Sequence, residues 1–200
     1  MSSHTDTPAT TPAIQPPRRA AVIFIFITVL LDVLSLGLII PVLPTMIKEE
    51  FLQNDLALAA VYVGWFGTLW ALMQFLFSPL MGAISDQFGR RPVILISCFG
   101  LGLDYVLMAV APNIVWLFVG RALSGIMAAS FSTAGAYIAD VTPPEKRAAS
   151  FGLIGAAWGI GFVVGPAVGG GLGEYGLRLP LWFAAGLTLL NALYGYFILP

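Results

Sequence analysis

Charged side chains are scarce in this chain. Only 10% of its residues are Asp, Glu, Lys or Arg, while 58% are hydrophobic. Soluble domains carry about 25% charged residues, so most of this chain needs a non-aqueous solvent. No basic face suggests a nucleic acid partner. The composition therefore predicts a polytopic membrane protein whose main partner is the lipid bilayer.

Residue types that carry catalysis or bind metals are almost missing. His4 is the single histidine and lies near the N-terminus, and Cys98 is the single cysteine, which excludes an internal disulfide. The chain has no phosphate-binding Gly-Lys-Ser/Thr loop and no cluster of metal ligands. We therefore expect neither an enzyme nor a cofactor or metal site, and we do not expect this chain alone to pump at the expense of ATP.

Long apolar segments occupy most of the remaining sequence. Residues 1–19 are rich in Ser, Thr and Pro and are predicted to form a disordered tail, whereas residues 20–200 form one bundle. A cleavable signal peptide after Arg18 and Arg19 fits poorly, because the apolar run continues past Pro41 with no small-residue cleavage site; a twin-Arg export signal fits worse. At about 20 residues per span, we expect six transmembrane helices, at approximately 20–44, 58–82, 93–111, 113–138, 149–172 and 179–199.

The basic residues predict the orientation, because cytoplasmic loops are enriched in Lys and Arg. Two basic residues, Lys48 and Arg178, fall on one side of the expected spans. Six fall on the other: Arg18, Arg19, Arg90, Arg91, Lys146 and Arg147. We therefore expect both termini and the loops at 83–92 and 140–148 in the cytoplasm. The longest loop on the opposite face is then 46–57.

A short motif recurs after three spans. Gly82, Asp86, Arg90 and Pro92 have the same spacing as a later set, namely Gly170, Glu174, Arg178 and Pro180. Since three spans separate the sets, they lie on opposite membrane faces. Inverted repeats of this kind are a known plan of transporters. The expected fold is an all-α membrane protein built as two inverted three-helix repeats, with a chance match of four residues as the alternative.

Three ionisable residues lie inside the expected spans: Asp32, Asp104 and Arg121. Each costs about 2.5–3.5 kcal/mol at a helix centre. A structural ion pair, or side chains that reach the headgroups, is one interpretation. The other is a water-lined cavity in which a carboxylate binds and releases a proton and Arg121 modulates it. Gln74, on a stripe of small residues in the second span, is assigned to the same cavity.

A second charged group lies near the expected cytoplasmic face. Its members include Asp86, Arg90, Arg91, Asp140, Glu145 and Arg147, with Gly89 at the turn. Solvated loop charges are the simplest interpretation, since surface pairs contribute little. However, Asp140 ends the fourth span at the depth of Arg90, so these two are predicted to pair. We expect this gate to form in one state of a carrier and to break in the other.

The fifth span is rich in glycine. Three glycines share one face, Gly161, Gly165 and Gly169, and Gly170 follows them; three others lie roughly opposite, Gly152, Gly155 and Gly159. Pro166 removes one backbone hydrogen bond and is expected to kink the helix. Tight packing is the plain interpretation of such spacing. The sharper prediction is a surface without side chains that packs against a helix of another domain.

These motifs resemble the major facilitator superfamily from Arg18 to Pro200. GAISDQFGRRP is similar to its loop between helices two and three, GRALSGIMAA to its fourth-helix motif, and GFVVGPAVGG to its antiporter motif. LDVLSLGLIIPVLP, GLDY and AYIADVTPPEKRA further resemble the bacterial tetracycline/proton antiporters within the drug:proton antiporter group. The resemblance implies export of an amphipathic drug, including its divalent-metal chelate, in exchange for protons. It also implies transport-critical roles for Asp32, Asp104 and Arg121, and gating roles for Asp86, Arg90, Asp140 and Arg147.

Members of that family have twelve helices, whereas six are expected here. The chain is thus interpreted as an N-terminal half, which is a truncated product, a fragment, or a partner of a second six-helix chain. We expect alternating access driven by the proton gradient in a bacterial inner membrane. The alternatives are a proton-coupled uptake symporter, which the antiporter-like glycine helix argues against, and a membrane partner that does not transport.

Overall fold

The computed structural model describes residues 19–128 and 130–198, and every regular element in these ranges is helical. In chain order the elements are α1 (Arg19–Ile39), α2 (Val42–Met46), the π-helical η1 (Ile47–Phe51), α3 (Leu56–Phe88), α4 (Arg90–Ala109), α5 (Ile114–Ala128), α6 (Ser130–Val141), α7 (Pro144–Tyr175) and α8 (Leu179–Ile198).

Five segments of the described residues are long and apolar enough to cross a membrane. They are Val22–Phe51, α3, α4, Ile114–Val141 and α7. α8 is 20 residues long and runs beside them as the sixth long segment. The predicted all-α membrane fold is confirmed, with α5 and α6 together taking the place of the fourth expected span.

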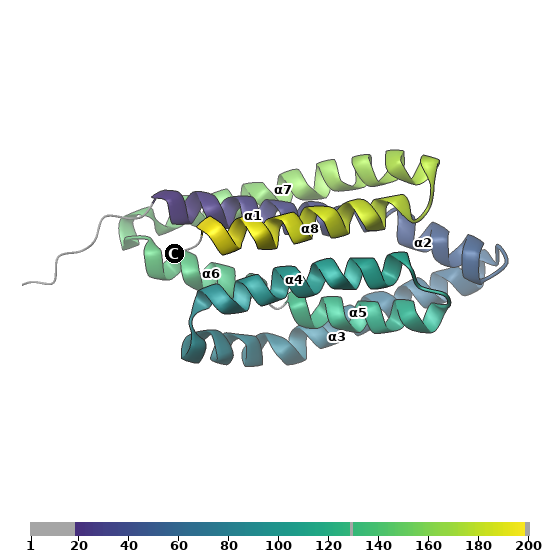
Figure 1. Ribbon diagram of the computed structural model, residues 1–200, viewed down its shortest axis with the longest axis horizontal. Coiled ribbons are helices and arrows are strands. Elements are labelled where there is room, and N and C mark those ends of the chain that lie inside the picture. The colour runs from purple at the N-terminus through teal and green to yellow at the C-terminus, as the bar shows by residue number, and fades with distance from the viewer. Residues whose placement is uncertain (1–18, 129, 199–200) are drawn as a thin grey trace, which may run out of the picture.

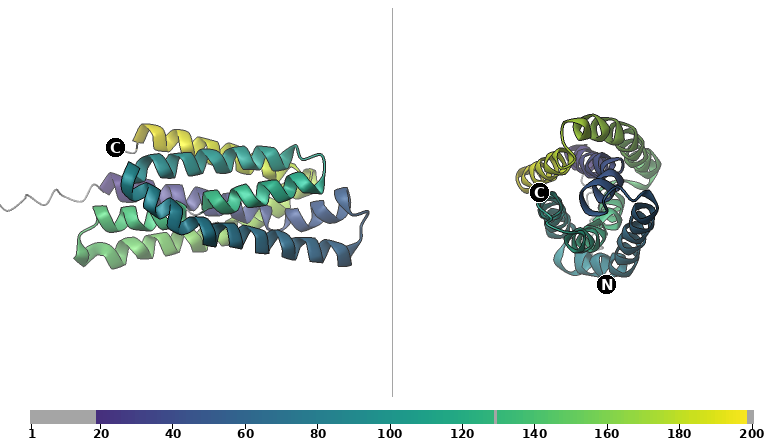
Figure 2. Two further views of the ribbon diagram at one scale, coloured as in Figure 1. Left: turned by 90° about the horizontal axis from the view of Figure 1, so that it is seen from below. Right: turned by 90° about the vertical axis from the view of Figure 1, so that its right-hand side faces the viewer.

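The long segments run side by side along one axis (Figure 2). The start of α1, the α3–α4 and α6–α7 junctions and the end of α8 share one end of the bundle (Figure 1). We call it the Gly89 end. The α4–α5 and α7–α8 junctions share the other, which we call the Arg178 end. α1 packs along α7 and α8, α4 along α8 and α5, and α3 along α5.

The connections are shorter than the sequence suggested, which corrects the predicted loops. α3 continues to Phe88, because residues 83–88 contain neither Gly nor Pro, and Gly89 alone separates α3 from α4. Likewise α6 reaches Val141 and α7 starts at Pro144, so most of 140–148 is helical. The predicted tail boundary also moves, since α1 begins at Arg19; residues 1–18 lie outside the described residues.

Most of the expected loop 46–57 is helical too, because α2 and η1 carry the chain to Phe51. The turn that follows uses Gln53 at φ 51° and Asn54 at φ 67°. Asp55 then accepts a hydrogen bond from the backbone N–H of Leu58 at 2.9 Å, which satisfies a free donor in the first turn of α3.

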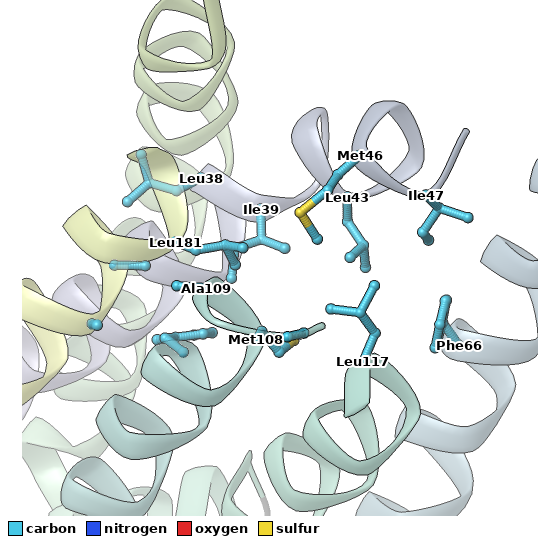
Figure 3. Packing of buried hydrophobic residues seen from close by; sticks show 14 of the residues in the cluster. Leu38, Ile39, Leu43, Met46, Ile47, Phe66, Met108, Ala109, Leu117 and Leu181 are labelled. Atoms are coloured by element: carbon cyan, nitrogen blue, oxygen red, sulfur yellow. The ribbon is translucent and has the colours of Figure 1, made fainter. Parts of the chain in front are cut away.

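Two apolar clusters fill the bundle. One lies towards the Arg178 end, where side chains of α1, α2 and η1 meet those of α3, α4, α5 and α8 (Figure 3). Leu38, Met46, Met108 and Leu117 in this cluster have no exposed surface. The other cluster surrounds Phe24, Ile25 and Val33 of α1 and includes side chains of α4, α6, α7 and α8. α1, α4 and α8 thus contribute to both clusters.

Candidate functional site

The three intramembrane charges are all buried. Asp32 of α1 is 5% exposed, Asp104 of α4 is 1% exposed, and Arg121 of α5 is 7% exposed. Asp32 and Arg121 line one small cavity of about 10 Å³, together with Trp70, Tyr105 and Ser124. That volume is about the room a single water needs. Asp32 and Arg121 thus line the same cavity, which is polar at these two residues.

Asp104 lies beside Arg121 without binding it. Within the described residues, neither carboxylate oxygen of Asp104 has a hydrogen-bond partner. The two charges nevertheless lie close enough to interact electrostatically. Gly120 makes room for this approach, since a Cβ there would stand 2.9 Å from Asp104 Oδ1. A buried carboxylate without hydrogen bonds is costly.

Only some of the hydrogen-bond donors of Arg121 have partners among the described residues. Its guanidinium donates to Ser124 Oγ at 2.9 Å, but Nε has no partner among the described residues. The same side chain reaches a second, larger pocket of about 200 Å³, lined by Ile40 and Pro44 on one side and by Phe66 on the other. Arg121 therefore stands between the small cavity with Asp32 and an apolar pocket towards the Arg178 end.

Asp32 has partners that the sequence reasoning missed. Asn191 Nδ2 of α8 donates to Asp32 Oδ1 at 3.2 Å, and Cys98 Sγ of α4 lies 3.8 Å from Asp32 Oδ2. The cavity residues expected from the sequence were the ionisable side chains and Gln74, and Asn191 was not among them. A lone Asn in an otherwise apolar helix was the available signal, because polar groups in lipid need partners.

Gln74 does not line the cavity to which it was assigned. It donates to the backbone carbonyl of Ala128 at 3.4 Å and so joins α3 to α5. Beside it the helices are close, since a Cβ on Gly125 would stand 2.5 Å from the carbonyl oxygen of Trp70. The small-residue stripe of the second span itself stays open, because a Cβ on Gly64, Gly67 or Gly82 would meet nothing within 4 Å.

Part of the expected charged cluster forms at the Gly89 end. Arg90 contacts Asp86 Oδ1 at 2.5 Å and Asp140 Oδ2 at 3.1 Å, and also donates to Ser85 Oγ at 2.6 Å. The predicted Arg90–Asp140 pair is therefore present and ties the end of α6 to the α3–α4 turn. Gly89 permits that turn, since its φ of 95° is strained for any side chain.

The other two arginines of this group bind helix ends. Arg91 donates to the carbonyl of Tyr196 near the end of α8 at 2.8 Å, and Arg147 donates to the carbonyl of Thr142 at 3.2 Å. Both contacts satisfy carbonyls that a helix terminus leaves free. Neither arginine pairs with a carboxylate of the cluster within the described residues.

The repeated motif has a counterpart cluster at the Arg178 end. Arg178 donates to Glu50 Oε2 at 3.0 and 2.7 Å and to the carbonyls of Ala109 and Ala111 at 2.9 and 3.0 Å. In both repeats, therefore, the arginine binds the acid that ends the first span of the other repeat. Its partner is Glu50 rather than the motif residue Glu174.

The glycine face of α7 is buried within this bundle, which corrects the prediction that it faces another domain. A Cβ on Gly161 would stand 2.7 Å from Val33 Cγ1, and one on Gly165 would stand 2.7 Å from the Cα of Gly37. Gly169 meets the backbone of Leu38 in the same way. The chain continues as one helix through Pro166. The open glycines are instead Gly152, Gly155, Gly159, Gly170 and Gly171.

No group of three or more His, Cys, Asp or Glu side chains that could hold a metal ion occurs among residues 19–128 and 130–198. The site thus consists of a buried carboxylate–guanidinium cavity, a second buried carboxylate beside it, and charged clusters at both ends. The Major Facilitator Superfamily model matches residues 25–200. The chain belongs to this superfamily.

Relatives of this superfamily chain include drug-resistance proteins. It is 45% identical to "Tetracycline resistance protein, class C" of Escherichia coli over 90% of its length and 44% of that protein. It is 38% identical to "Multidrug resistance protein 1" of Bacillus subtilis (strain 168), over 80% of its length and 40% of that protein. The chain thus spans less than half the length of these superfamily relatives.

A solved superfamily structure has the same fold. The crystal structure of the human organic anion transporter MFSD10 (TETRAN) superposes with a TM-score of 0.80 at 30% sequence identity. The match covers 93% of this chain and 48% of that one. The expected N-terminal-half architecture is confirmed by this fit and by the coverage of the tetracycline resistance proteins.

Proposed function

We propose that this chain is the N-terminal half of a proton-coupled exporter of amphipathic, tetracycline-like drugs. The observation that carries the proposal is the small cavity lined by both Asp32 and Arg121, with neither side chain in an ion pair within the described residues. Buried charges kept in this form cost several kcal/mol. Their retention, in a chain 45% identical to a tetracycline resistance protein, supports a proton-carrying role.

In the proposed cycle, a proton binds the Asp32 carboxylate and reduces its attraction for Arg121. The guanidinium already lines the larger apolar pocket, so a shift of this one side chain links the protonation of Asp32 to that pocket. Alternating access then follows from rocking of two six-helix halves about the central site. Asp104 contributes a second negative charge near Arg121. The transported species includes the divalent-metal chelate of the drug.

The partner in this proposal is a second six-helix half. α3 and α7 offer it a large exposed surface, with Trp65, Phe75, Leu76 and Val163 all more than half exposed. The open glycines of α7 belong to the same helix and let a partner helix approach closely. By the distribution of Lys and Arg, we place the Gly89 end in the cytoplasm of a bacterium and the bundle in its inner membrane.

Uptake of labelled tetracycline into inverted membrane vesicles tests the proposal. Vesicles from bacteria that express the gene encoding this chain should accumulate the drug when the interior is acidified. Asp32→Asn should lower that uptake about a hundredfold, because a positioned proton-transfer group contributes on that scale. The exposed acid Glu174 supplies the control, and Glu174→Gln should leave uptake unchanged.

Three results would contradict the proposal. Uptake that persists in Asp32→Asn would remove the proposed proton carrier. Solute entry driven by protons in right-side-out vesicles, without drug uptake in inverted ones, would make the protein a symporter. Absence of transport under every gradient would indicate that the protein is a membrane partner that does not itself transport.

A further inference from the structure

Asn191 holds an unusual position for an amide in a membrane helix. It is 1% exposed, and its Nδ2 donates both to Asp32 Oδ1 and to the carbonyl of Thr28, each at 3.2 Å. The same nitrogen lies 3.8 Å from Cys98 Sγ. Three helices, α1, α4 and α8, therefore meet at the Asp32 carboxylate, and Asn191 supplies the strongest donor there.

The internal repeat relates the position of Asn191 to that of Asp104. The two copies of the turn motif are offset by 88 residues, from Arg90 to Arg178. Asp32 and Arg121 are offset by 89, from 32 to 121, and Asp104 and Asn191 by 87, from 104 to 191. Asp32 thus corresponds to Arg121, and Asp104 corresponds to Asn191. The buried pair Asp32–Asn191 is therefore the repeat equivalent of the pair Arg121–Asp104. Each repeat places one charged residue in its first span and one polar residue in its third.

We propose that Asn191 is a positioning residue for Asp32, the counterpart in the second repeat of Asp104 beside Arg121. The inference rests on the proposed function, because it assigns Asn191 a task in proton coupling. The amide holds the carboxylate in one orientation on the wall of the small cavity and stabilises its ionised form by a hydrogen bond to charge. When Asp32 takes up a proton, this bond weakens and the contact between α1 and α8 loosens.

The other polar groups near Asp32 show how much of its hydrogen bonding depends on the Asn191 amide. Two titratable side chains of α4, Cys98 and Tyr105, lie near Asp32, and Arg121 of α5 lines the same cavity. Arg121 lines the same cavity without an ion pair to Asp32 in the described residues. Among the described residues Asn191 is thus the donor in direct contact with Asp32, and its removal leaves the carboxylate with the weak thiol of Cys98.

Asn191→Leu tests the inference, since it keeps the volume and removes the donor. Thr188→Val is the matched control: Thr188 is buried three residues earlier on α8 and donates to Ser35 of α1 at 3.1 Å, in the same helix contact but away from Asp32. Asn191→Thr restores a donor on the same side chain, one bond nearer the backbone. The variants are made in the full-length protein, and the amount of folded protein is measured for each.

Two measurements are compared at a series of pH values. The first is drug–proton exchange, which we expect to fall about tenfold in Asn191→Leu, as loss of a hydrogen bond to a charged group predicts, and less than about threefold in Thr188→Val. The second is the infrared C=O stretching band of protonated Asp32, identified by its absence in Asp32→Asn. In Asn191→Leu the band should persist to higher pH, since a donor favours the ionised form, and Asn191→Thr should reverse most of that change.

The outcomes separate the two proposals. An Asp32 band that titrates alike in Asn191→Leu and Thr188→Val overturns the positioning role, whatever happens to exchange, and leaves Asn191 as a helix-packing residue. A shifted band supports the positioning role even in a variant that no longer transports. If Asp32→Asn retains full exchange, the proposed function fails, while the band still reports whether Asn191 controls Asp32.

Discussion

At the Gly89 end Arg90 binds two carboxylates, whereas at the Arg178 end Arg178 binds one carboxylate and two backbone carbonyls. The partners of Arg90 are open to solvent, with the Asp86 and Asp140 side chains 64% and 58% exposed. The Glu50 side chain is 28% exposed. The same residue, repeated 88 positions apart, is thus built into two different environments.

This difference indicates at which end of the bundle the contacts can break and re-form. Carboxylates on separate helices can exchange partners, and exposed pairs contribute little to stability. The carbonyls of Ala109 and Ala111 lie at the C-terminus of α4, where free acceptors and the helix dipole hold a cation in place. We therefore expect the Arg90 cluster to act as a gate that opens and closes, and the Arg178 cluster to act as a fixed anchor.

Substitution of the two arginines gives the largest effects and tests that division directly. Arg178→Gln should lower the free energy of unfolding by about 2 kcal/mol, because four hydrogen bonds, two of them to a carboxylate, are lost. Arg90→Gln should lower it by about 1 kcal/mol or less but should reduce the rate of drug exchange more. Chemical unfolding in detergent and vesicle transport measure the two quantities. Equal losses of stability for both variants would remove the contrast between gate and anchor.

Neutralising the acids of the two motif copies sharpens the comparison. Asp86→Asn should lower the maximal rate of exchange about tenfold with little change in the drug concentration at half-maximal rate, since Asp86 contacts Arg90 and not the cavity. Glu174→Gln, at the equivalent position in the other copy, should change neither quantity, because Arg178 pairs with Glu50. Weaker drug binding with an unchanged maximal rate in Asp86→Asn would count against the gate.

The sequence predicted what depends on local pattern. Apolar length gave the spans, the scarcity of charge identified Asp32 and Arg121, and chain direction placed Asp140 near Arg90. It failed where the partner lies far along the chain: Glu50 is 128 residues from Arg178, and Asn191 is 159 residues from Asp32. No local spacing relates such pairs. The face of α7 was also misassigned, because glycine spacing shows that a close neighbour exists but not that the neighbour is α1.

The last comparison concerns the glycines at the two turns. Gly89 has φ 95°, a conformation that side chains rarely adopt, whereas Gly176 has φ 165°, which is extended backbone open to any residue. Gly89→Ala should therefore lower the free energy of unfolding by about 1 kcal/mol, and Gly176→Ala should leave it unchanged or raise it slightly by restricting the unfolded chain. Parallel unfolding curves for the two variants decide this. If Gly89→Ala were as stable as Gly176→Ala, the α3–α4 turn would not need its glycine, and the position of Arg90 would have to be set by its ion pairs alone.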